Sequence, residues 1–379
     1  MRNLVLINNS YSTFGGEDSN FETEYENLSK YFNVIKFSLK NEEKITLKNL
    51  IAIFFSNNYS SNKALSKLVD NNEIEVAYVH NTWYQINLGI FRLLEKKNIT
   101  TIVKLHNFRF DCIESNHYRN NTNCHECQTS SRLKGIIYRC YKNSYLKSYL
   151  ITRYSKKFFK ILKNKDLKIY VLTSFHKHYL EQQNISSKKI FIQKNFVNFP
   201  KQDNKYKSDS NYVTIIGRLE LGKGVEASIE SILKSQYKEL DLYVLGDGQQ
   251  FNYLSKKYAN HENIKFFGHL SNDEVLFYLK NAKFNLFGSR MYEGQPVVIS
   301  ESSTNNVPTI LPKNGGLAEF FPENYNLFYE QDDEGTNLIK VLNDLSDEKL
   351  KQASKDIRKY FTKTFQPSEL INEFKKNYE

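Results

Sequence analysis

The sequence predicts an α/β protein with two doubly wound domains, and three observations carry this prediction. The chain has 379 residues, which is too long for one ordinary domain. Short apolar runs typical of buried strands alternate with helical patterns along most of its length. The alternation is interrupted by a polar segment without periodicity at 199–211, which we interpret as a linker. We therefore expect two domains of similar size, each built on an open parallel sheet.

The composition excludes several other classes of protein. Apolar residues make up 40% and charged residues 25% of the chain, which is typical of globular proteins rather than disordered ones. No run of 18 uninterrupted apolar residues could form a transmembrane helix. The apolar run at residues 4–7 is too short for a secretion signal, so we expect a cytoplasmic protein.

The N-terminal domain is predicted to span residues 1–198. It opens with a buried-strand pattern at 4–7, a glycine-containing turn at 10–16 and a helix at 21–31, which is the usual start of a doubly wound unit. Further strands are predicted at 51–55, 76–79, 101–105 and 168–172.

A second α/β series follows the linker and is predicted to span residues 212–360. Its strands are expected at 212–216, 242–245, 264–267, 284–287 and 308–311, and its helices at 225–233, 251–259 and 273–279. The remaining segment, 361–379, has the pattern of a helix.

Two groups of polar residues in the second domain suggest a ligand site. Gly217-Arg218-Leu219 follows a strand, and Gly222-Lys223-Gly224 precedes a helix, so two cations lie in a glycine-rich turn at a helix N-terminus, where phosphate binds favourably. Glu293 and Glu301 are eight residues apart and could accept hydrogen bonds from sugar hydroxyls. Taken singly, each group could equally be a solvated surface feature.

The order and spacing of these motifs resemble the nucleotide-sugar domain of family 4 glycosyltransferases, which are retaining enzymes of the GT-B type with two Rossmann-like domains facing a central cleft. The motifs that carry the resemblance are Gly217-Arg218-Leu219, Lys223-Gly224, Gly246-Asp247-Gly248, Phe267-Gly268, Leu270, Glu293-Gly294, Pro296, Glu301 and Pro308. It implies that Arg218 and Lys223 neutralise the donor diphosphate, that Glu301 holds the ribose and that Glu293 holds the sugar and acts in catalysis. It also implies that the last helix crosses back to the N-terminal domain.

One segment departs from the family pattern. Residues 302–306, Ser-Ser-Thr-Asn-Asn, stand where these enzymes usually have small Ala and Gly residues. This departure concerns the end of the local helix rather than the donor site.

The N-terminal domain offers weaker candidates. Gly15 and Gly16 lie in the first strand–helix loop, where the resemblance implies close approach to the donor, and the alternative is a flexible loop tip. His106 follows a strand, and the resemblance implies a catalytic position beside the donor sugar, whereas a structural histidine is the alternative. His80 ends the preceding strand in the same way and is a weaker candidate for acceptor contact.

All four cysteines fall within one short stretch. Cys112, Cys124, Cys127 and Cys140 include a Cys-x2-Cys pair, the spacing of structural zinc sites. The stretch at about 107–141 is similar to an insertion in a subset of these transferases. Two interpretations stay open: a structural zinc ion held by four thiolates, or packed free thiols.

A basic segment spans residues 132–168 and contains twelve Lys or Arg residues against a single acid, Asp166. Aromatic and aliphatic residues recur among the cations at helical spacing. An interfacial helix on an anionic membrane and a helix packed on its own domain with a solvated basic face both fit this pattern. Nucleic acid is not expected as a partner, because no recognised nucleic-acid motif is present.

The resemblance implies a retaining glycosyltransferase that moves a sugar from a UDP- or GDP-sugar to a growing cell-surface glycan, such as capsule, O-antigen or exopolysaccharide, on a lipid-linked acceptor. Such an enzyme would work peripherally on the inner face of the membrane. No cofactor is expected for catalysis, because Arg218 and Lys223 would replace a divalent metal. A nucleotide-sugar epimerase of the same architecture and a non-catalytic, membrane-associated glycan-binding protein are the alternatives.

Overall fold

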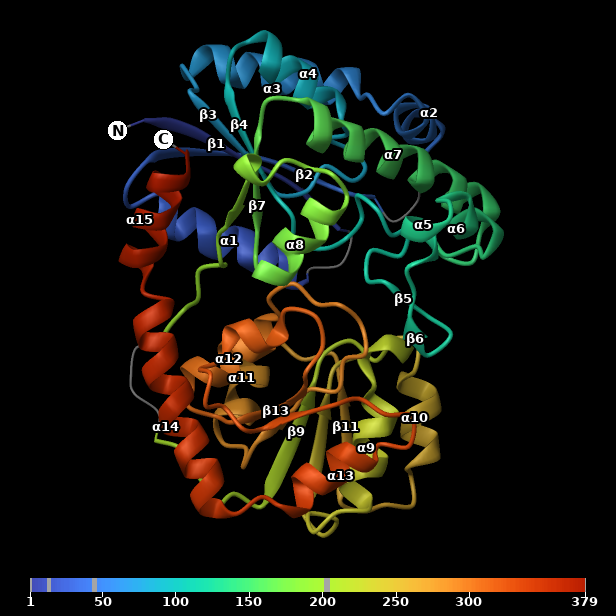
Figure 1. Ribbon diagram of the computed structural model, residues 1–379, viewed down its shortest axis with the longest axis vertical. Helices are drawn as coiled ribbons and strands as arrows, with labels where there is room; N and C mark the ends of the chain where they lie inside the picture. Colours follow the sequence, from blue (N-terminus) through green and yellow to red (C-terminus); the bar gives the residue numbers. More distant parts are fainter. Residues whose placement is uncertain (1, 12–14, 43–45, 201–204, 379) are drawn as a thin grey trace. The chain divides into compact units, whose positions relative to one another are not determined.

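The computed structural model describes residues 2–11, 15–42, 46–200 and 205–378, and these divide into two compact units. The first unit comprises residues 1–117, 124–196 and 367–379, and the second comprises 118–123 and 197–366. Each unit carries one parallel six-stranded sheet with helices around it (Figure 1). This arrangement confirms the predicted α/β class with two parallel-sheet domains.

The sheet of the first unit has the strand order β2-β1-β3-β4-β7-β8, with all neighbours parallel. Its strands are β1 (Asn3–Ser10), β2 (Asn33–Lys40), β3 (Val76–Val79), β4 (Thr100–Lys104), β7 (Lys168–Val171) and β8 (Ile190–Ile192). Every residue of β3 is buried, because helices cover both faces of a parallel sheet and a central strand is therefore apolar on both sides.

Most helices of the first unit connect these strands. They are α1 (Gly16–Leu28), α2 (Leu47–Phe55), α3 (Tyr59–Asn71), α4 (Gly89–Lys96), α5 (Glu126–Thr129), α6 (Leu133–Ile137), α7 (Tyr145–Asn164), α8 (Ser174–Gln182) and α15 (Pro367–Tyr378). A short antiparallel hairpin, β5 (Tyr118–Arg119) and β6 (Thr122–Asn123), lies in the cysteine-containing stretch and groups with the second unit. In the described part of the chain, no helix is both long and apolar enough to cross a membrane.

The strand predicted at 51–55 is wrong, because these residues form the second half of α2. Thr46 caps this helix by accepting a hydrogen bond from the backbone N–H of Asn49. An apolar run of five residues fits a buried strand and a helix equally well, so the pattern alone could not separate the two.

The second unit has the strand order β11-β10-β9-β12-β13-β14, again with parallel neighbours. Its strands are β9 (Tyr212–Ile216), β10 (Asp241–Leu245), β11 (Ile264–Gly268), β12 (Asn285–Leu286), β13 (Thr309–Pro312) and β14 (Phe328–Tyr329). Its helices are α9 (Val225–Leu233), α10 (Phe251–Lys257), α11 (Asn272–Lys280), α12 (Val297–Thr304), α13 (Thr336–Asn343) and α14 (Asp347–Thr364). Of the predicted linker, residues 201–204 lie outside the described residues, and 199–200 and 205–211 form no helix or strand.

The C-terminal segment differs from its predicted bounds. The expected boundary at 360 falls inside α14, since the amphipathic pattern of that helix continues to Thr364, and α15 begins only at Pro367. Helix α15 packs on strands of the first unit. Tyr170 donates a hydrogen bond to the backbone oxygen of Phe374 over 3.4 Å, and the Gln193 amide donates to the oxygen of Leu370 over 3.1 Å.

Candidate active site

The turn after β9 is built by glycines that approach another backbone closely. Gly217 and Gly246 follow neighbouring strands and have φ angles of 143° and 140°. A Cβ on Gly246 would lie 2.0 Å from the carbonyl oxygen of Gly217, so no other residue fits there. Arg218 projects from this turn, is largely exposed and lies 2.9 Å from Glu220. The structure therefore places Arg218 at the surface, in an ion pair with its own loop.

Lys223 and Glu293 are brought together in the second unit. Lys223 Nζ lies 2.6 Å from Glu293 Oε1, and the Ser289 hydroxyl donates to the same oxygen over 2.5 Å. Both charged side chains are mostly buried, with 18% and 14% of their surface exposed. The pair joins the segment before α9 to the loop before α12.

The backbone holds these two segments against each other. Gly224 has a φ of 62° and immediately precedes α9, and a Cβ at this position would lie 2.2 Å from the carbonyl oxygen of Gly288. The N–H of Arg290 donates to the carbonyl oxygen of Gly222 over 2.8 Å. Lys223 is thus fixed beside the N-terminus of a helix, where its charge and the helix dipole both favour an anion.

Glu301 lies in the middle of α12 and is largely buried. Burial raises the pKa of its carboxyl to about 7. The segment at 302–306, which departs from the family pattern, contains the C-terminal end of this helix. The hydroxyl of Ser302 donates back to the carbonyl oxygen of Val298, and Asn306 adopts a left-handed conformation with a φ of 64°. Glu301 therefore presents a carboxyl that exchanges its proton near neutral pH.

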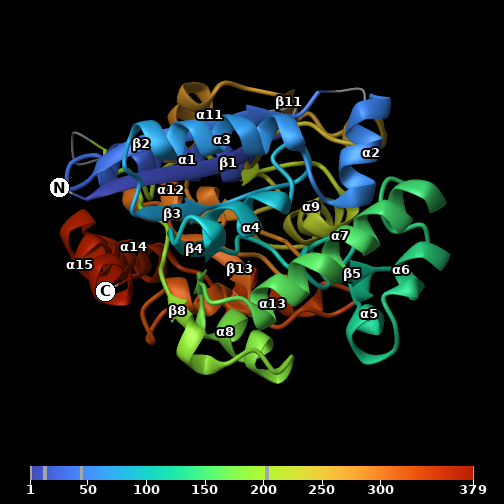
Figure 2. The ribbon, with the colours of Figure 1, turned by 90° about the horizontal axis from the view of Figure 1, so that it is seen from above.

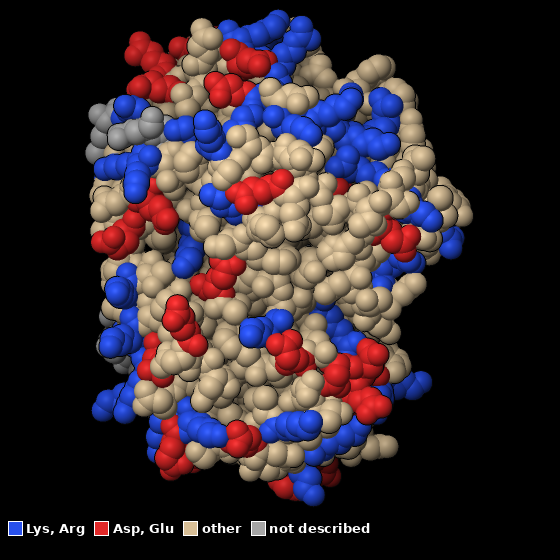
Figure 3. All heavy atoms as spheres, in the orientation of Figure 1, with Lys and Arg blue, Asp and Glu red and all other residues tan. Residues whose placement is uncertain are grey.

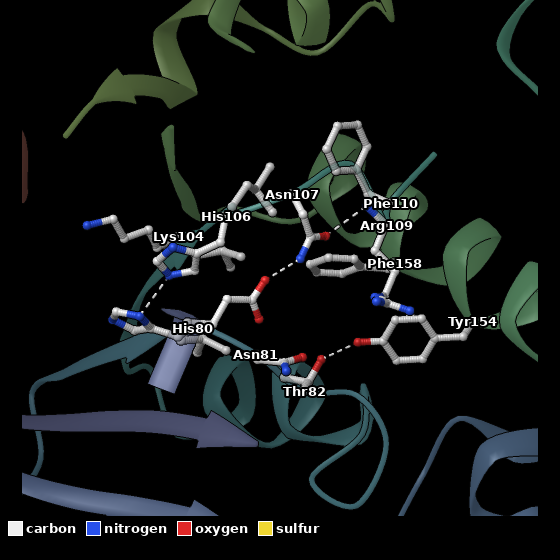
Figure 4. Close-up of a pocket in the computed structure, with 14 residues that line it drawn as sticks. His80, Asn81, Thr82, Lys104, His106, Asn107, Arg109, Phe110, Tyr154 and Phe158 are labelled. Carbon is white, nitrogen blue, oxygen red and sulfur yellow. Dashed lines mark hydrogen bonds between the residues drawn. The ribbon is translucent and has the colours of Figure 1, made fainter. Parts of the chain in front are cut away.

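A small cavity in the first unit opens at the carboxyl ends of β3 and β4 (Figure 4). His106 Nε2 lies 2.9 Å from His80 Nδ1, and the two rings stack with their centroids 5.0 Å apart. His80 Nε2 in turn lies 2.9 Å from Glu24 Oε2, at ion-pair distance but without hydrogen-bond geometry. Lys104 Nζ contacts the other oxygen of Glu24. The structure thus links both predicted histidines to a buried ion pair.

The charges in this chain of residues follow from their burial. Burial would raise the pKa of Glu24, but Lys104 and His80 outweigh it and lower the pKa to about 2. Burial lowers the pKa of Lys104, and Glu24 partly offsets that change. Burial, reinforced by His80 and Lys104, also lowers the pKa of His106 well below its ordinary value. His106 is therefore a neutral imidazole at physiological pH, next to an ionised carboxylate–ammonium pair.

Sequence reasoning missed several residues of this cavity. The Asn107 amide donates to Glu17 Oε1 over 2.6 Å, and Thr82 Oγ1 lies 2.5 Å from the Tyr154 hydroxyl (Figure 4). Burial raises the pKa of Glu17, opposed by the nearby Arg109. Glu17 immediately follows the predicted glycine pair, so its position in the first strand–helix loop was the available signal.

Gly15 and Gly16 stand at the start of α1, and both are exposed. Gly15 has an extended backbone and donates its N–H to Asp18 Oδ2 over 3.2 Å. A Cβ on Gly15 would meet no atom within 4 Å, so packing within the chain does not require glycine there.

All four cysteines lie in the described residues, and none of them forms a disulfide. Burial raises the pKa of Cys112 to about 11, and burial together with the neighbouring thiols raises that of Cys140 to about 12. Across the described ranges, no group of three or more His, Cys, Asp or Glu side chains is arranged to hold a metal ion. Since zinc binds four thiolates in a compact tetrahedron, a structural zinc ion held by these cysteines stays a prediction. Packed free thiols stay the alternative interpretation.

Residues 198–364 match the family model described as "Glycosyl transferases group 1". This part of the chain is therefore similar to the domain of group 1 glycosyltransferases. The match confirms the expectation of a transferase, and its range contains Lys223 and Glu293. The assignment to family 4, and to a subset with a cysteine-containing insertion, stays a prediction. None of the curated protein sequences matches the chain.

Solved glycosyltransferases have the same fold. Sucrose-phosphate synthase from Thermosynechococcus elongatus aligns over 100% of this chain and 98% of its own, with a TM-score of 0.72 and 14% identity. HepE from Anabaena, solved with UDP-glucose, aligns over 99% of both chains, with a TM-score of 0.66 and 11% identity. A mutant of TarM from S. aureus, solved with fondaparinux, α-GlcNAc-glycerol and UDP, has a TM-score of 0.59 and 16% identity.

The TarM alignment covers 84% of this chain but only 58% of TarM. At these identities the likeness concerns the fold, and it confirms the GT-B class predicted from the sequence.

Proposed function

We propose that this protein is a retaining glycosyltransferase that transfers a sugar from a UDP- or GDP-sugar to a growing cell-surface glycan. The observation that carries the proposal is the Lys223–Glu293 pair, joined over 2.6 Å beside the N-terminus of α9 within the group 1 domain. A cation for phosphate and a carboxylate for sugar hydroxyls are the two groups that a nucleotide-sugar site requires.

The donor would be held by its phosphates, ribose and sugar. Lys223 and the α9 N-terminus would stabilise the charge that develops on the leaving diphosphate, and Arg218 would turn from Glu220 towards it. Glu293, freed from Lys223 by the incoming phosphate, would accept hydrogen bonds from the sugar, and Glu301 from the ribose. Because these cations belong to the chain itself, we propose that catalysis needs no divalent metal or other cofactor.

His106 would act beside the anomeric carbon. A neutral imidazole can accept or donate one hydrogen bond at the sugar without placing a full positive charge against an oxocarbenium-like transition state. An ionised Glu24 favours the His80 tautomer that carries its proton on Nε2. His80 Nδ1 then accepts from His106 Nε2, which leaves His106 Nδ1 as the acceptor towards the substrate. Acceptor contact by His80 itself is disfavoured by its burial, since its side chain is 1% exposed.

The acceptor side of the proposal has two supports. TarM was solved with UDP and two glycan-like molecules, and HepE was solved with UDP-glucose. These structures favour a UDP-sugar as the first donor to test, and the TarM structure favours a glycan as the acceptor. The basic segment 132–168 supports a lipid-linked acceptor, such as a capsule, O-antigen or exopolysaccharide precursor, and a peripheral location on the inner face of the membrane.

The test is thermal stability with UDP-, GDP-, ADP- and CMP-sugars, applied to wild type, Lys223→Ala and the control Lys256→Ala. Lys256 is an exposed lysine on α10 of the same domain. A donor that binds the folded state should raise the melting temperature of wild type and control but not of Lys223→Ala. No shift with any nucleotide sugar would contradict the proposal and favour the glycan-binding alternative. An altered nucleotide sugar formed without acceptor would identify an epimerase instead.

A further inference from the structure

Helix α2 turns its apolar side towards solvent. Leu47, Ile51 and Phe55 repeat every four residues along one face and are 74%, 52% and 64% exposed, and Phe54 beside them is 39% exposed. Only Asn49 and Ile53 of this helix are buried. A surface helix of a globular domain normally buries its apolar stripe, so an outward stripe needs a partner outside the unit.

This stripe belongs to a larger apolar surface. Of the fourteen large hydrophobic side chains that are exposed in the described residues, ten lie on α2, α6, α7 and the first residue of α3. They are Leu47, Ile51, Phe54, Phe55, Tyr59, Leu133, Ile137, Tyr145, Leu146 and Tyr149. We call these ten side chains the α2–α7 surface. Such a concentration on one part of one unit is not the scatter expected for an ordinary soluble surface.

The helices that carry the surface lie side by side in two perpendicular views (Figures 1 and 2). Cations of α7 fasten the end of α2: Arg153 donates to the carbonyl oxygen of Phe54 over 3.3 Å, and Lys157 to that of Phe55 over 2.9 Å. The Arg153 guanidinium also lies 4.4 Å from the centre of the Phe54 ring. Helix α2 is therefore held against α7 by its carbonyl end while its apolar stripe stays exposed.

Positive charge surrounds these apolar side chains. Lys48, Arg139, Lys142, Lys147 and Lys156 are exposed on or next to the same helices. Figure 3 shows Lys and Arg side chains gathered over this part of the first unit. Two copies of the chain would repel each other if they met through such a basic surface, whereas an anionic bilayer offers negative headgroups beside an apolar interior.

We infer that the α2–α7 surface binds an anionic membrane, with the α2 stripe inserted among the acyl chains and the α7 cations on the headgroups. The inference names the surface that would produce the membrane association in the proposed function, and it rests on that function. It adds α2, which lies outside the basic segment 132–168, as the inserting element. Helix α7 also lines the site cavity through Tyr154, so the same helix connects the membrane surface to His106 and its neighbours.

Vesicle flotation tests the inference without any turnover. Wild type, the double variant Ile51→Ser/Phe55→Ser and the control double variant Tyr253→Ser/Phe277→Ser are mixed with vesicles of phosphatidylcholine, alone or with phosphatidylglycerol. Tyr253 and Phe277 are equally exposed but belong to the second unit. All four side chains are at the surface, so both variants should fold, and their melting temperatures check this.

Wild type and control should float with the anionic vesicles and not with the neutral ones. The α2 double variant should bind at least about tenfold more weakly, because two inserted apolar side chains are lost. Its remaining binding should disappear at high salt, which screens the α7 cations. Equal binding of the α2 variant and wild type, or no binding of wild type to anionic vesicles, would overturn the inference. A change from dimer to monomer in the α2 variant would show that the surface joins two copies instead.

This result is independent of the donor site. Nucleotide-sugar stabilisation with no vesicle binding would refute the membrane surface alone. Vesicle binding without any nucleotide-sugar stabilisation would refute the proposed donor site and leave the membrane surface standing.

Discussion

Replacing Glu301 with glutamine should stabilise the protein while weakening its donor site. Burial raises the pKa of the Glu301 carboxyl from its ordinary 4.5 to about 7. Between these two pH values the folded state holds a proton that the unfolded state has released, so stability falls as pH rises through this window. Each pH unit corresponds to about 1.4 kcal/mol, so the ionised carboxylate costs about 3 kcal/mol above neutral pH.

The assay is urea unfolding of wild type, Glu301→Gln and the control Glu239→Gln, at about pH 4 and about pH 8. Glu239 is an exposed glutamate of the same unit. At the higher pH, Glu301→Gln should be more stable than wild type by up to about 3 kcal/mol, and at the lower pH the two should nearly coincide. Glu239→Gln should follow wild type at both. Parallel pH dependences of wild type and Glu301→Gln would refute the argument, because the cost comes only from the ionised carboxylate.

The same substitution should weaken donor binding, although it should stabilise the folded protein. An ionised Glu301 can accept two hydrogen bonds from a ribose, and a protonated one loses part of this capacity. Donor affinity of wild type should therefore fall as pH drops from about 8 to about 6. Glu301→Gln should bind donor weakly at every pH in that range. If the donor affinity of wild type does not change with pH, Glu301 does not bind the ribose.

The remaining predictions concern the two charged pairs and the last helix. Glu24→Gln leaves Lys104 buried without its counter-ion and should lower the free energy of unfolding, measured in urea, by about 3–5 kcal/mol. A decrease below about 1 kcal/mol would mean that water reaches the pair. Lys223→Ala should lower kcat/KM about a hundredfold or more in a transferase assay while Lys256→Ala does not, and equal loss in both would exclude a specific phosphate contact. Phe374→Ala removes a fully buried ring of α15 and should cost about 3–5 kcal/mol, whereas a near-neutral result in unfolding would show that α15 is not part of the first unit's core.

The elements best predicted from the sequence are those whose burial is complete and local. The strand expected at 76–79 coincides with β3, and the helix expected at 225–233 coincides with α9. Continuous apolar runs identify strands covered on both faces, and a 3.6-residue period identifies a helix covered on one. The same logic failed at 51–55. It assumes that apolar residues point inwards, whereas three of the four large apolar side chains of this stretch remain exposed.

The candidate site was predictable where its residues stand at strand ends and not where they pair across the fold. His80 and His106 follow strands, and the sequence shows this directly. Glu24 and Lys104 are 80 residues apart, so no local pattern joins them. A signal was nevertheless present. Lys104 continues the apolar run of β4, and a buried lysine requires a buried acid.

The partner of Lys104 could also have been sought by helical phase. Phe21, Glu24 and Leu28 are spaced three and four residues apart, so the sequence places Glu24 on the apolar face of α1, and all three are buried. A buried acid or a buried base is improbable when it stands alone in the core. The two become reasonable as a pair, because each charge compensates the other. In a doubly wound domain α1 packs against the central strands, so the topology alone allows this pairing. Matching misplaced charges between elements that the fold brings together is thus a physical route from a sequence to the supports of an active site.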